Sequence, residues 1–119
     1  VLFKILFDFL IIQKNYMKNL SSDNLVQKLK SDKDAFLLDV RTEEEYNMSH
    51  IPNSKLLNIR DPQLFIDGIQ GFDKSKNYYV YCHSGVRSVQ ACQIMKTFGF
   101  NNLNNLIGGI SEWKGLKTT

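Results

Sequence analysis

The sequence predicts an α/β domain with a central, mostly parallel sheet of five strands and helices on both faces. Strand-like and helix-like segments alternate from Tyr16 onward, which implies crossover connections and therefore parallel strands. The runs at 36–40 (FLLDV) and 78–81 (YYVY) are nearly continuous in apolar and aromatic residues, as expected for strands buried on both faces. With 119 residues, the chain can form one domain with its own core.

The expected strands are short and regularly interleaved with helices. They are predicted at 17–20, 36–40, 55–59, 78–81 and 103–107. The first is expected at an edge of the sheet. Ligands in such sheets bind beyond the carboxyl ends of the strands, which draws attention to the residues after 78–81.

Helix signals separate these strands. Ser21 or Ser22 can cap a helix through about residue 30. Thr42 and Glu45 have the spacing of a capping box, which opens a short helix. Pro62 is suited to the first turn of a helix that runs through about residue 69.

One more helix and a final turn are expected in the C-terminal third. A helix is predicted at 88–98, and Gly99 follows it where a C-terminal cap needs positive φ. Gly108 and Gly109 permit a tight turn into residues 110–114, where Trp113 is expected to be buried.

The N-terminal residues 1–16 are expected to be an apolar segment outside the core domain, which spans 17–119. The run VLFKILFDFLII at 1–12 is shorter than the roughly 18 residues that a membrane span requires. We interpret it as a helix that packs on the domain or on a partner. The alternatives are an anchor that lies on a membrane surface and a truncated targeting segment.

Composition excludes several classes of function. The net charge of +3 comes from 15 basic and 12 acidic residues spread along the chain, without the basic stripe of a nucleic-acid-binding protein. Two cysteines are too few for a disulfide scaffold, and no Cys/His cluster has zinc-ligand spacing. A reactive thiol without a clear signal sequence favours the cytoplasm, with the cell envelope as the alternative.

The segment Cys82-His83-Ser84-Gly85-Val86-Arg87-Ser88 directly follows the predicted strand at 78–81. Backbone N–H groups of a short loop around Gly85 can converge on one point. The positive end of the following helix is directed to the same place, and Arg87 adds a cation. A thiol in that field has a lowered pKa and is largely thiolate, the reactive form. The pattern predicts an anion cradle with Cys82 as nucleophile.

Four sequence motifs, taken together, resemble the single-domain rhodanese-like sulfurtransferases. They occur in the order and spacing of that family and cover about residues 17–115: LLDVR (37–41), SHIPNS (49–54), YVYCHSGVRS (79–88) and GGISEW (108–113).

The resemblance implies a mechanism. Cys82 takes the outer sulfur of thiosulfate or of a persulfide and carries it as a persulfide. A thiol or cyanide acceptor then removes it, as in covalent catalysis with two displacement steps. The implied partners are a small-molecule or protein donor and a thiol acceptor, without a metal or organic cofactor.

The resemblance also assigns roles to the loop after Cys82. Residues His83, Ser84, Gly85, Val86, Arg87 and Ser88 are expected to surround the transferred sulfur or its donor. Arg87 closes the loop, binds an anionic donor, or does both. Ser88 caps the helix or donates to the sulfur, and capping alone is the favoured interpretation. Because Arg87 is the one firmly cationic residue here, thiosulfate is expected to bind weakly.

Asp39, Arg41 and His50 are expected to support the site rather than to react. Asp39 and Arg41 end a buried strand and are expected to anchor neighbouring loops. His50 lies in a motif where Ser49 and Asn53 replace the two glycines of the family pattern, so the turn is expected to be less tight. Cys92, ten residues after Cys82, is expected to be a core residue, because a straight helix separates them by about 15 Å.

Two other functions fit the same residues less well. A cysteine phosphatase needs a longer loop, with its arginine six positions after the cysteine, whereas Arg87 is five positions after Cys82. A non-catalytic interaction or regulatory module remains the main alternative, although such domains often lack the cysteine.

Overall fold

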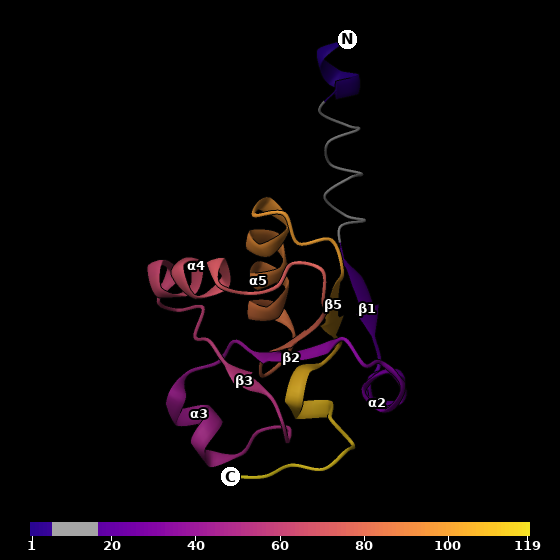
Figure 1. Cartoon of the computed structure of the whole chain (residues 1–119), viewed down its shortest axis with the longest axis vertical. Helices are drawn as coiled ribbons and strands as arrows, with labels where there is room; N and C mark the ends of the chain where they lie inside the picture. Colours follow the sequence, from indigo (N-terminus) through magenta and orange to yellow (C-terminus); the bar gives the residue numbers. More distant parts are fainter. Residues whose placement is uncertain (6–16) are drawn as a thin grey trace.

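The computed structural model describes residues 1–5 and 17–119 (Figure 1). Its centre is a five-stranded sheet in the order β1-β5-β4-β2-β3, and every neighbouring pair is parallel. The strands are β1 (Lys18–Leu20), β2 (Ala35–Asp39), β3 (Lys55–Leu56), β4 (Asn77–Tyr81) and β5 (Leu103–Leu106). The α/β class, the five strands and the edge position of the first strand are as the sequence predicted.

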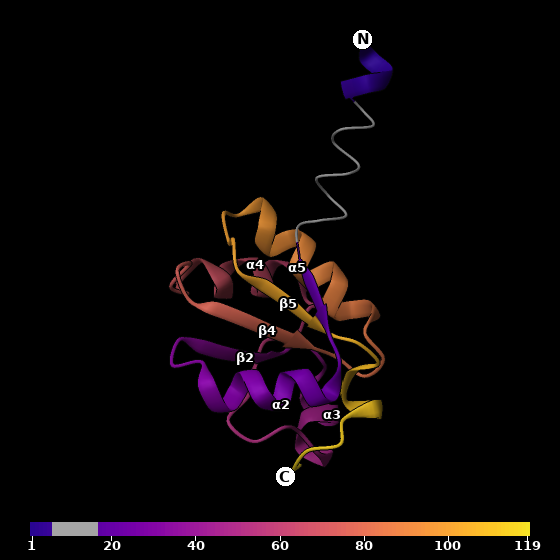
Figure 2. The same ribbon diagram turned by 90° about the vertical axis from the view of Figure 1, so that its right-hand side faces the viewer.

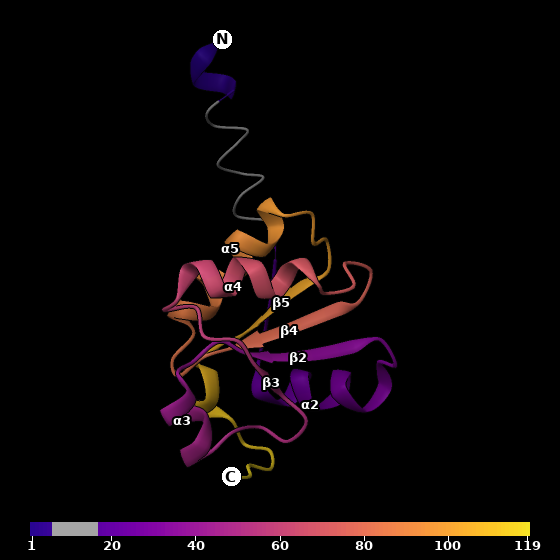
Figure 3. The same ribbon diagram turned by 60° about the vertical axis from the view of Figure 1, so that its left-hand side comes forward.

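Helices cover both faces of the sheet, as Figure 3 shows most clearly. Helices α4 (Pro62–Gln70) and α5 (Val86–Thr97) lie on one face. The other face is covered by α2 (Ser22–Ser31), by α3 (Glu43–Met48) and by the 3-10 turn η1 (Gly109–Glu112). Figure 2 shows α5 and α2 on opposite sides of the central strands.

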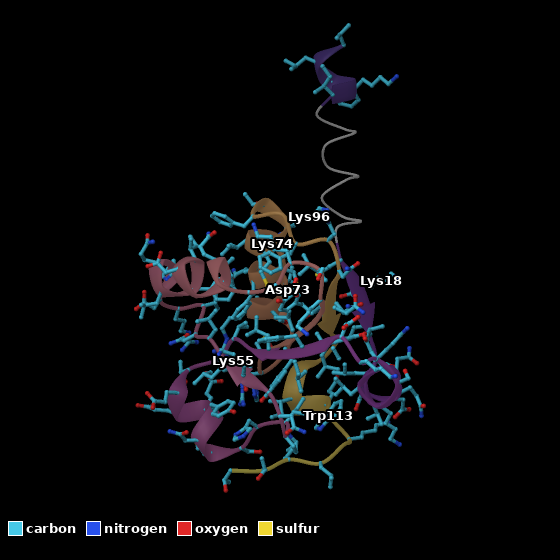
Figure 4. The ribbon with its side chains drawn as sticks, in the orientation of Figure 1. Lys18, Lys55, Asp73, Lys74, Lys96 and Trp113 are labelled. Atoms are coloured by element: carbon cyan, nitrogen blue, oxygen red, sulfur yellow. The ribbon has the colours of Figure 1, made fainter. Side chains whose placement is uncertain are left out.

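Alternation along the strands explains these two layers, because successive side chains point to opposite faces. Leu38 and Val80 belong to the core beneath α4 and α5. Leu37 and Tyr79, their neighbours in sequence, belong to the second core, beneath α2 and η1. Trp113 joins that second core, as the sequence predicted, and Figure 4 labels it in the yellow C-terminal segment.

Two predicted boundaries are wrong. The strand expected at 55–59 ends at Leu56. Beyond it, Leu57 donates to the Asp39 carbonyl and Ile59 to the Val40 carbonyl. In a regular parallel ladder, N–H donors two residues apart bond to carbonyls that are also two residues apart. Here the two carbonyls belong to consecutive residues, so the regular pairing of the strand ends.

The helix expected at 88–98 instead begins at Val86, because Gly85 adopts φ 104° and acts as its N-cap. This glycine conformation turns the chain directly from the end of β4 into α5. The earlier start moves Arg87 and Ser88 into the first turn of the helix.

The N-terminal segment is described only in part. Residues 2–5 form one helical turn with exposed apolar side chains. The rest of the helix expected over 1–16 lies outside the described residues. Within the described part of the chain, no helix combines the length and apolarity that crossing a membrane requires.

The turn at Gly108 and Gly109 packs against the chain that leaves β4. Ile110 and Ser111 donate their backbone N–H groups to the carbonyls of Cys82 and His83, at 2.9 and 3.0 Å. A Cβ atom on Gly109 would lie 2.4 Å from the His83 carbonyl oxygen, and the residue has φ 60°. The close approach therefore requires glycine at this position.

We predict that Gly109→Ala lowers the free energy of unfolding by about 2 kcal/mol or more, because it combines left-handed strain with a backbone clash. The matched control is Gly71→Ala, since a Cβ there would meet its nearest neighbour at 3.9 Å with ordinary φ. Urea unfolding measures both variants. Equal stability of the two would contradict this account of the turn.

Candidate functional site

The site lies at the carboxyl end of β4, in the centre of the sheet. Cys82 directly follows this strand and is 1% exposed. Its sulfur faces the first turn of α5, where the Gly85 N–H donates to Sγ at 3.1 Å and Ser88 Oγ lies at 3.4 Å. The nucleophile predicted from the sequence is thus enclosed by its own loop and the following helix.

Two opposing effects set the pKa of the Cys82 thiol. Burial raises it, because the interior disfavours a charged sulfur. Hydrogen bonds from the Ser88 side chain and from the backbone N–H groups of Ser88, Gly85 and Ser84 lower it and prevail, so the pKa is below its ordinary value. The Ser88 hydroxyl and backbone N–H dipoles, rather than a side-chain cation in contact with sulfur, favour the thiolate here.

Ser88 does not cap the helix, so the favoured sequence interpretation is wrong. Gly85 is the N-cap, and Ser88 lies in the first turn of α5, fully buried beside the sulfur. Its hydroxyl donates to Oδ1 of Asn105 at 2.5 Å. The other alternative was donation to the sulfur; Ser88 Oγ lies 3.4 Å from Sγ, but in this arrangement its hydrogen is directed to Asn105.

Arg87 closes the loop against α3. Its two terminal nitrogens donate to the two carboxylate oxygens of Glu45 at 2.7 and 2.9 Å, a bidentate ion pair. Glu45 also completes the predicted capping box with Thr42. One carboxylate therefore starts α3 and secures the Cys82 loop from the opposite side of the cleft.

Asp39 and Arg41 form a second ion pair below the loop. The Arg41 guanidinium donates to both Asp39 oxygens, the shortest contact being 2.7 Å, and both side chains are buried. Arg41 also donates to the Ser49 carbonyl at 2.8 Å. The pair thus connects the end of β2 to the segment before His50, the kind of anchor expected from the sequence.

His50 contacts α3 and the C-terminal segment. Its ring stacks on Tyr46 at 3.7 Å between centroids, and its Nδ1 is 2.8 Å from the Tyr46 carbonyl oxygen. Its backbone pairs with Thr118. Asn53 adopts φ 67° in the turn that follows, so asparagine here takes the left-handed conformation that glycine usually provides.

A pocket of about 440 Å³ opens beside the Cys82 loop. It is lined by Arg41, Glu45, Met48, Ser49, His83, Arg87, Ile110, Ser111 and Lys117. Arg41 and Arg87 are both neutralised by carboxylates. Lys117 forms no ion pair with any residue that the structure describes. The pocket is therefore only weakly cationic.

The remaining loop residues differ in their exposure. His83, Ser84 and Val86 are exposed, and Gly85 is half-buried. Cys92 is fully buried in α5, where burial raises its pKa to about 12. Within residues 1–5 and 17–119, no three His, Cys, Asp or Glu side chains are grouped so as to hold a metal ion.

Three contributors to the site were not predicted from the sequence. Glu45 was identified only as a capping residue, because its second partner is 42 positions away. Asn105 was not singled out, although a polar residue inside a buried strand was a usable signal. The N–H groups of Ile110 and Ser111, which hold the loop, have no sequence signature because every residue except proline carries one.

The Arg87–Glu45 pair predicts a pH-dependent stability. Hydrogen bonding to Arg87 lowers the pKa of Glu45 from 4.5 to about 2. A carboxylate with a lowered pKa stabilises the fold above its unfolded value, and the contribution disappears as the pH falls from 4.5 toward 2. We expect Glu45→Gln to lower the free energy of unfolding by about 1 kcal/mol near pH 7. Near pH 2 we expect the substitution to change it little.

Urea unfolding over this pH range measures the difference, and Glu44→Gln is the control, since Glu44 is exposed on the same helix. A loss in Glu45→Gln that stayed constant down to pH 2 would show that the ion pair does not carry it.

Comparison with known proteins shows the family of this chain. The model of the rhodanese-like domain family matches residues 21–116. A sulfurtransferase of Allochromatium vinosum is 32% identical over 97 residues, covering 82% of this chain and 88% of its own. The thiosulfate sulfurtransferase GlpE of Coxiella burnetii is 32% identical over 98 residues, with coverages of 82% and 85%.

Solved structures show the same fold. A rhodanese-like domain protein from Staphylococcus aureus superposes with a TM-score of 0.72 and 35% identity, covering 82% of this chain and 91% of its own. The family model, the similar sequences and the shared architecture agree, and from them it follows that this chain belongs to the rhodanese-like domain family.

Proposed function

We propose that this chain is a sulfurtransferase that moves a sulfane sulfur through a persulfide on Cys82. The observation that carries the proposal is the enclosure of the Cys82 sulfur, which faces the Gly85 N–H at 3.1 Å at the N-terminus of α5. Relatives named as sulfurtransferases, at about 32% identity, support it.

In the first step the Cys82 thiolate attacks the outer sulfur of a donor persulfide. The new S–S bond forms as the donor's own S–S bond breaks, and the donor thiolate leaves. With thiosulfate the leaving group is sulfite. The negative charge on the transferred sulfur can rest among the backbone N–H groups of the loop, which act as an oxyanion hole does for oxygen.

In the second step an acceptor thiolate attacks the outer sulfur of the Cys82 persulfide. The acceptor leaves as a persulfide, and Cys82 returns to its thiolate form. No electrons are gained or lost overall, so the cycle needs no redox cofactor. The donor and acceptor use the same site in turn, which gives ping-pong kinetics.

The charges beside the loop favour a thiol-bound persulfide over free thiosulfate. Thiosulfate is a compact dianion and gains most from an unpaired cation. Arg87 is held by Glu45 at 2.7 Å and Arg41 is held by Asp39, which leaves Lys117 as the one pocket-lining lysine or arginine without an ion pair among the described residues. The apolar and peptide parts of a larger persulfide can contact Met48 and Ile110 in the adjoining pocket.

A non-catalytic interaction module is the competing function. It requires only a surface, and it leaves the lowered pKa of Cys82 and the inward N–H groups unexplained. A direct measurement of sulfur on Cys82 separates the two.

We predict that incubation with glutathione persulfide adds about 32 Da, one sulfur atom, to the protein, and that thiosulfate does so more slowly. Intact-mass spectrometry measures both rates. Cys82→Ala must abolish the addition. Cys92→Ala is the matched control and must retain it, because Cys92 is fully buried and its pKa is raised by burial. Folded, reduced protein that gains no sulfur from either donor would contradict the proposal and favour the interaction module.

A further inference from the structure

Three side chains form a row that leads from the Cys82 sulfur to the surface of the sheet's edge strand. Ser88 Oγ lies 3.4 Å from Sγ. Ser88 donates to Oδ1 of Asn105 at 2.5 Å, and Nδ2 of Asn105 donates to Oδ1 of Asn19 at 3.1 Å. Ser88 and Asn105 are buried, whereas Asn19 is exposed on β1. The row therefore connects a buried nucleophile to a solvent-accessible amide.

The sheet register explains this alignment. Asn105 in β5 lies opposite Val80 of β4 and opposite Asn19 of β1. Val80 packs in the core beneath α5, so residues at this register face that helix. An amide 4% exposed in a central strand is costly unless both of its ends are paired. Here both ends are paired, one to the neighbour of the sulfur.

The number of hydrogens along the row limits how it can be arranged. A serine hydroxyl carries a single hydrogen, and Ser88 gives it to Asn105. With Cys82 as a thiol, its S–H can donate to Ser88 Oγ, and every bond runs outward from sulfur to Asn19. This arrangement satisfies each group of the row.

The arrangement fails once the sulfur loses its hydrogen. A thiolate, or the inner sulfur of a persulfide, can only accept, so Ser88 must turn its hydrogen inward. If Asn105 stayed fixed, two bare oxygens would then face each other at 2.5 Å. A half-turn of the Asn105 amide replaces Oδ1 by Nδ2, which donates to Ser88, and exposed Asn19 can turn in the same way.

We propose that Asn105 is a positioning residue that reverses with the state of Cys82, so that Ser88 donates to the sulfur whenever the sulfur has no hydrogen. Asparagine suits this role because its amide offers a donor and an acceptor of nearly equal size. Asp would only accept, and Leu would do neither. The inference rests on the proposed function solely in taking Cys82 as the nucleophile.

Other charges near the sulfur stay the same in this comparison. Arg87 with Glu45 approaches from α5 and α3, and Asp39 with Arg41 lies at the end of β2. His83 is exposed on the loop. The backbone N–H groups of the loop act on the sulfur in every variant of Asn105.

The experiment measures the pKa of Cys82 from the pH dependence of alkylation by iodoacetamide. Buried Cys92 provides the background, measured in Cys82→Ala. We expect Asn105→Asp to raise the pKa by about one unit or more, because Ser88 is then held by the carboxylate. We expect Asn105→Leu to change the pKa by less than about half a unit, because Ser88 keeps its hydrogen for the sulfur.

Repeating both variants in a Ser88→Ala background distinguishes an effect on the Cys82 pKa that is transmitted through Ser88 from the direct electrostatic effect of a new carboxylate. An effect transmitted by Ser88 disappears there, whereas the through-space effect of a new carboxylate remains. An equal shift in the two backgrounds would overturn the inference. So would an unshifted pKa in Asn105→Asp.

Asn19→Asp decides the matter if the buried variants fail to fold, since this residue is exposed. The carboxylate introduced at this position can only accept a hydrogen bond, so it keeps Nδ2 of Asn105 directed toward residue 19. Oδ1 of Asn105 then stays directed toward Ser88. We expect a raised pKa that persists in about 0.5 M salt, where exposed charges are screened, and that is absent with Ser88→Ala. No shift, or a shift that salt removes, would contradict the inference.

The two proposals can fail separately. Alkylation needs no sulfur donor, so the expected pKa pattern without persulfide formation would reject only the proposed function. Persulfide formation with unchanged pKa values in the Asn105 and Asn19 variants would reject only the role of Asn105.

Discussion

The ion pair between Arg87 and Glu45 is the contact on which the architecture of the site depends. It joins the first turn of α5 to the first turn of α3, two elements that the sheet alone does not bring together. Because Glu45 also completes the cap of α3, movement of the loop would disturb the start of that helix. The pair therefore holds the Cys82 loop in a closed form in which its N–H groups face the sulfur.

This closure determines how charge is distributed around Cys82. With Arg87 occupied by Glu45, backbone dipoles and the Ser88 hydroxyl provide most of the stabilisation of negative sulfur. Such groups are neutral, so they stabilise an anion that forms on Cys82 without strongly attracting a small free dianion from solution. The ion pair between Arg87 and Glu45 therefore accounts both for the use of neutral donors around the sulfur and for the weak positive charge beside the loop.

The sequence predicts the fold well because its signals are local. Caps at Ser21 and Thr42 and the apolar runs of β2 and β4 each act within a few residues. Cys82 and Arg87 were found because one short segment contains both. Glu45 and Asn105 were not predicted as site residues because their partners at the site come from distant elements. Contacts between residues far apart in the sequence cannot be predicted from the spacing of neighbouring residues.

The start of α5 was misplaced for a related reason. Ser88 is a good capping residue in isolation, but Gly85 at positive φ can start the helix earlier. The positive φ of Gly85, just after β4, starts the helix at this residue. Ser88 therefore lies inside the helix, where its side chain contacts the sulfur. The competition between the two signals is settled by tertiary structure.

We propose that Glu45, by neutralising Arg87, lowers the preference of the site for thiosulfate as donor. Glu45→Gln tests it directly, since glutamine preserves the capping box and an acceptor for Arg87 while removing the charge. We predict that kcat/KM for thiosulfate rises several-fold relative to that for glutathione persulfide, at low salt. A ratio of the two values that is unchanged, or that moves toward the persulfide, would contradict the account.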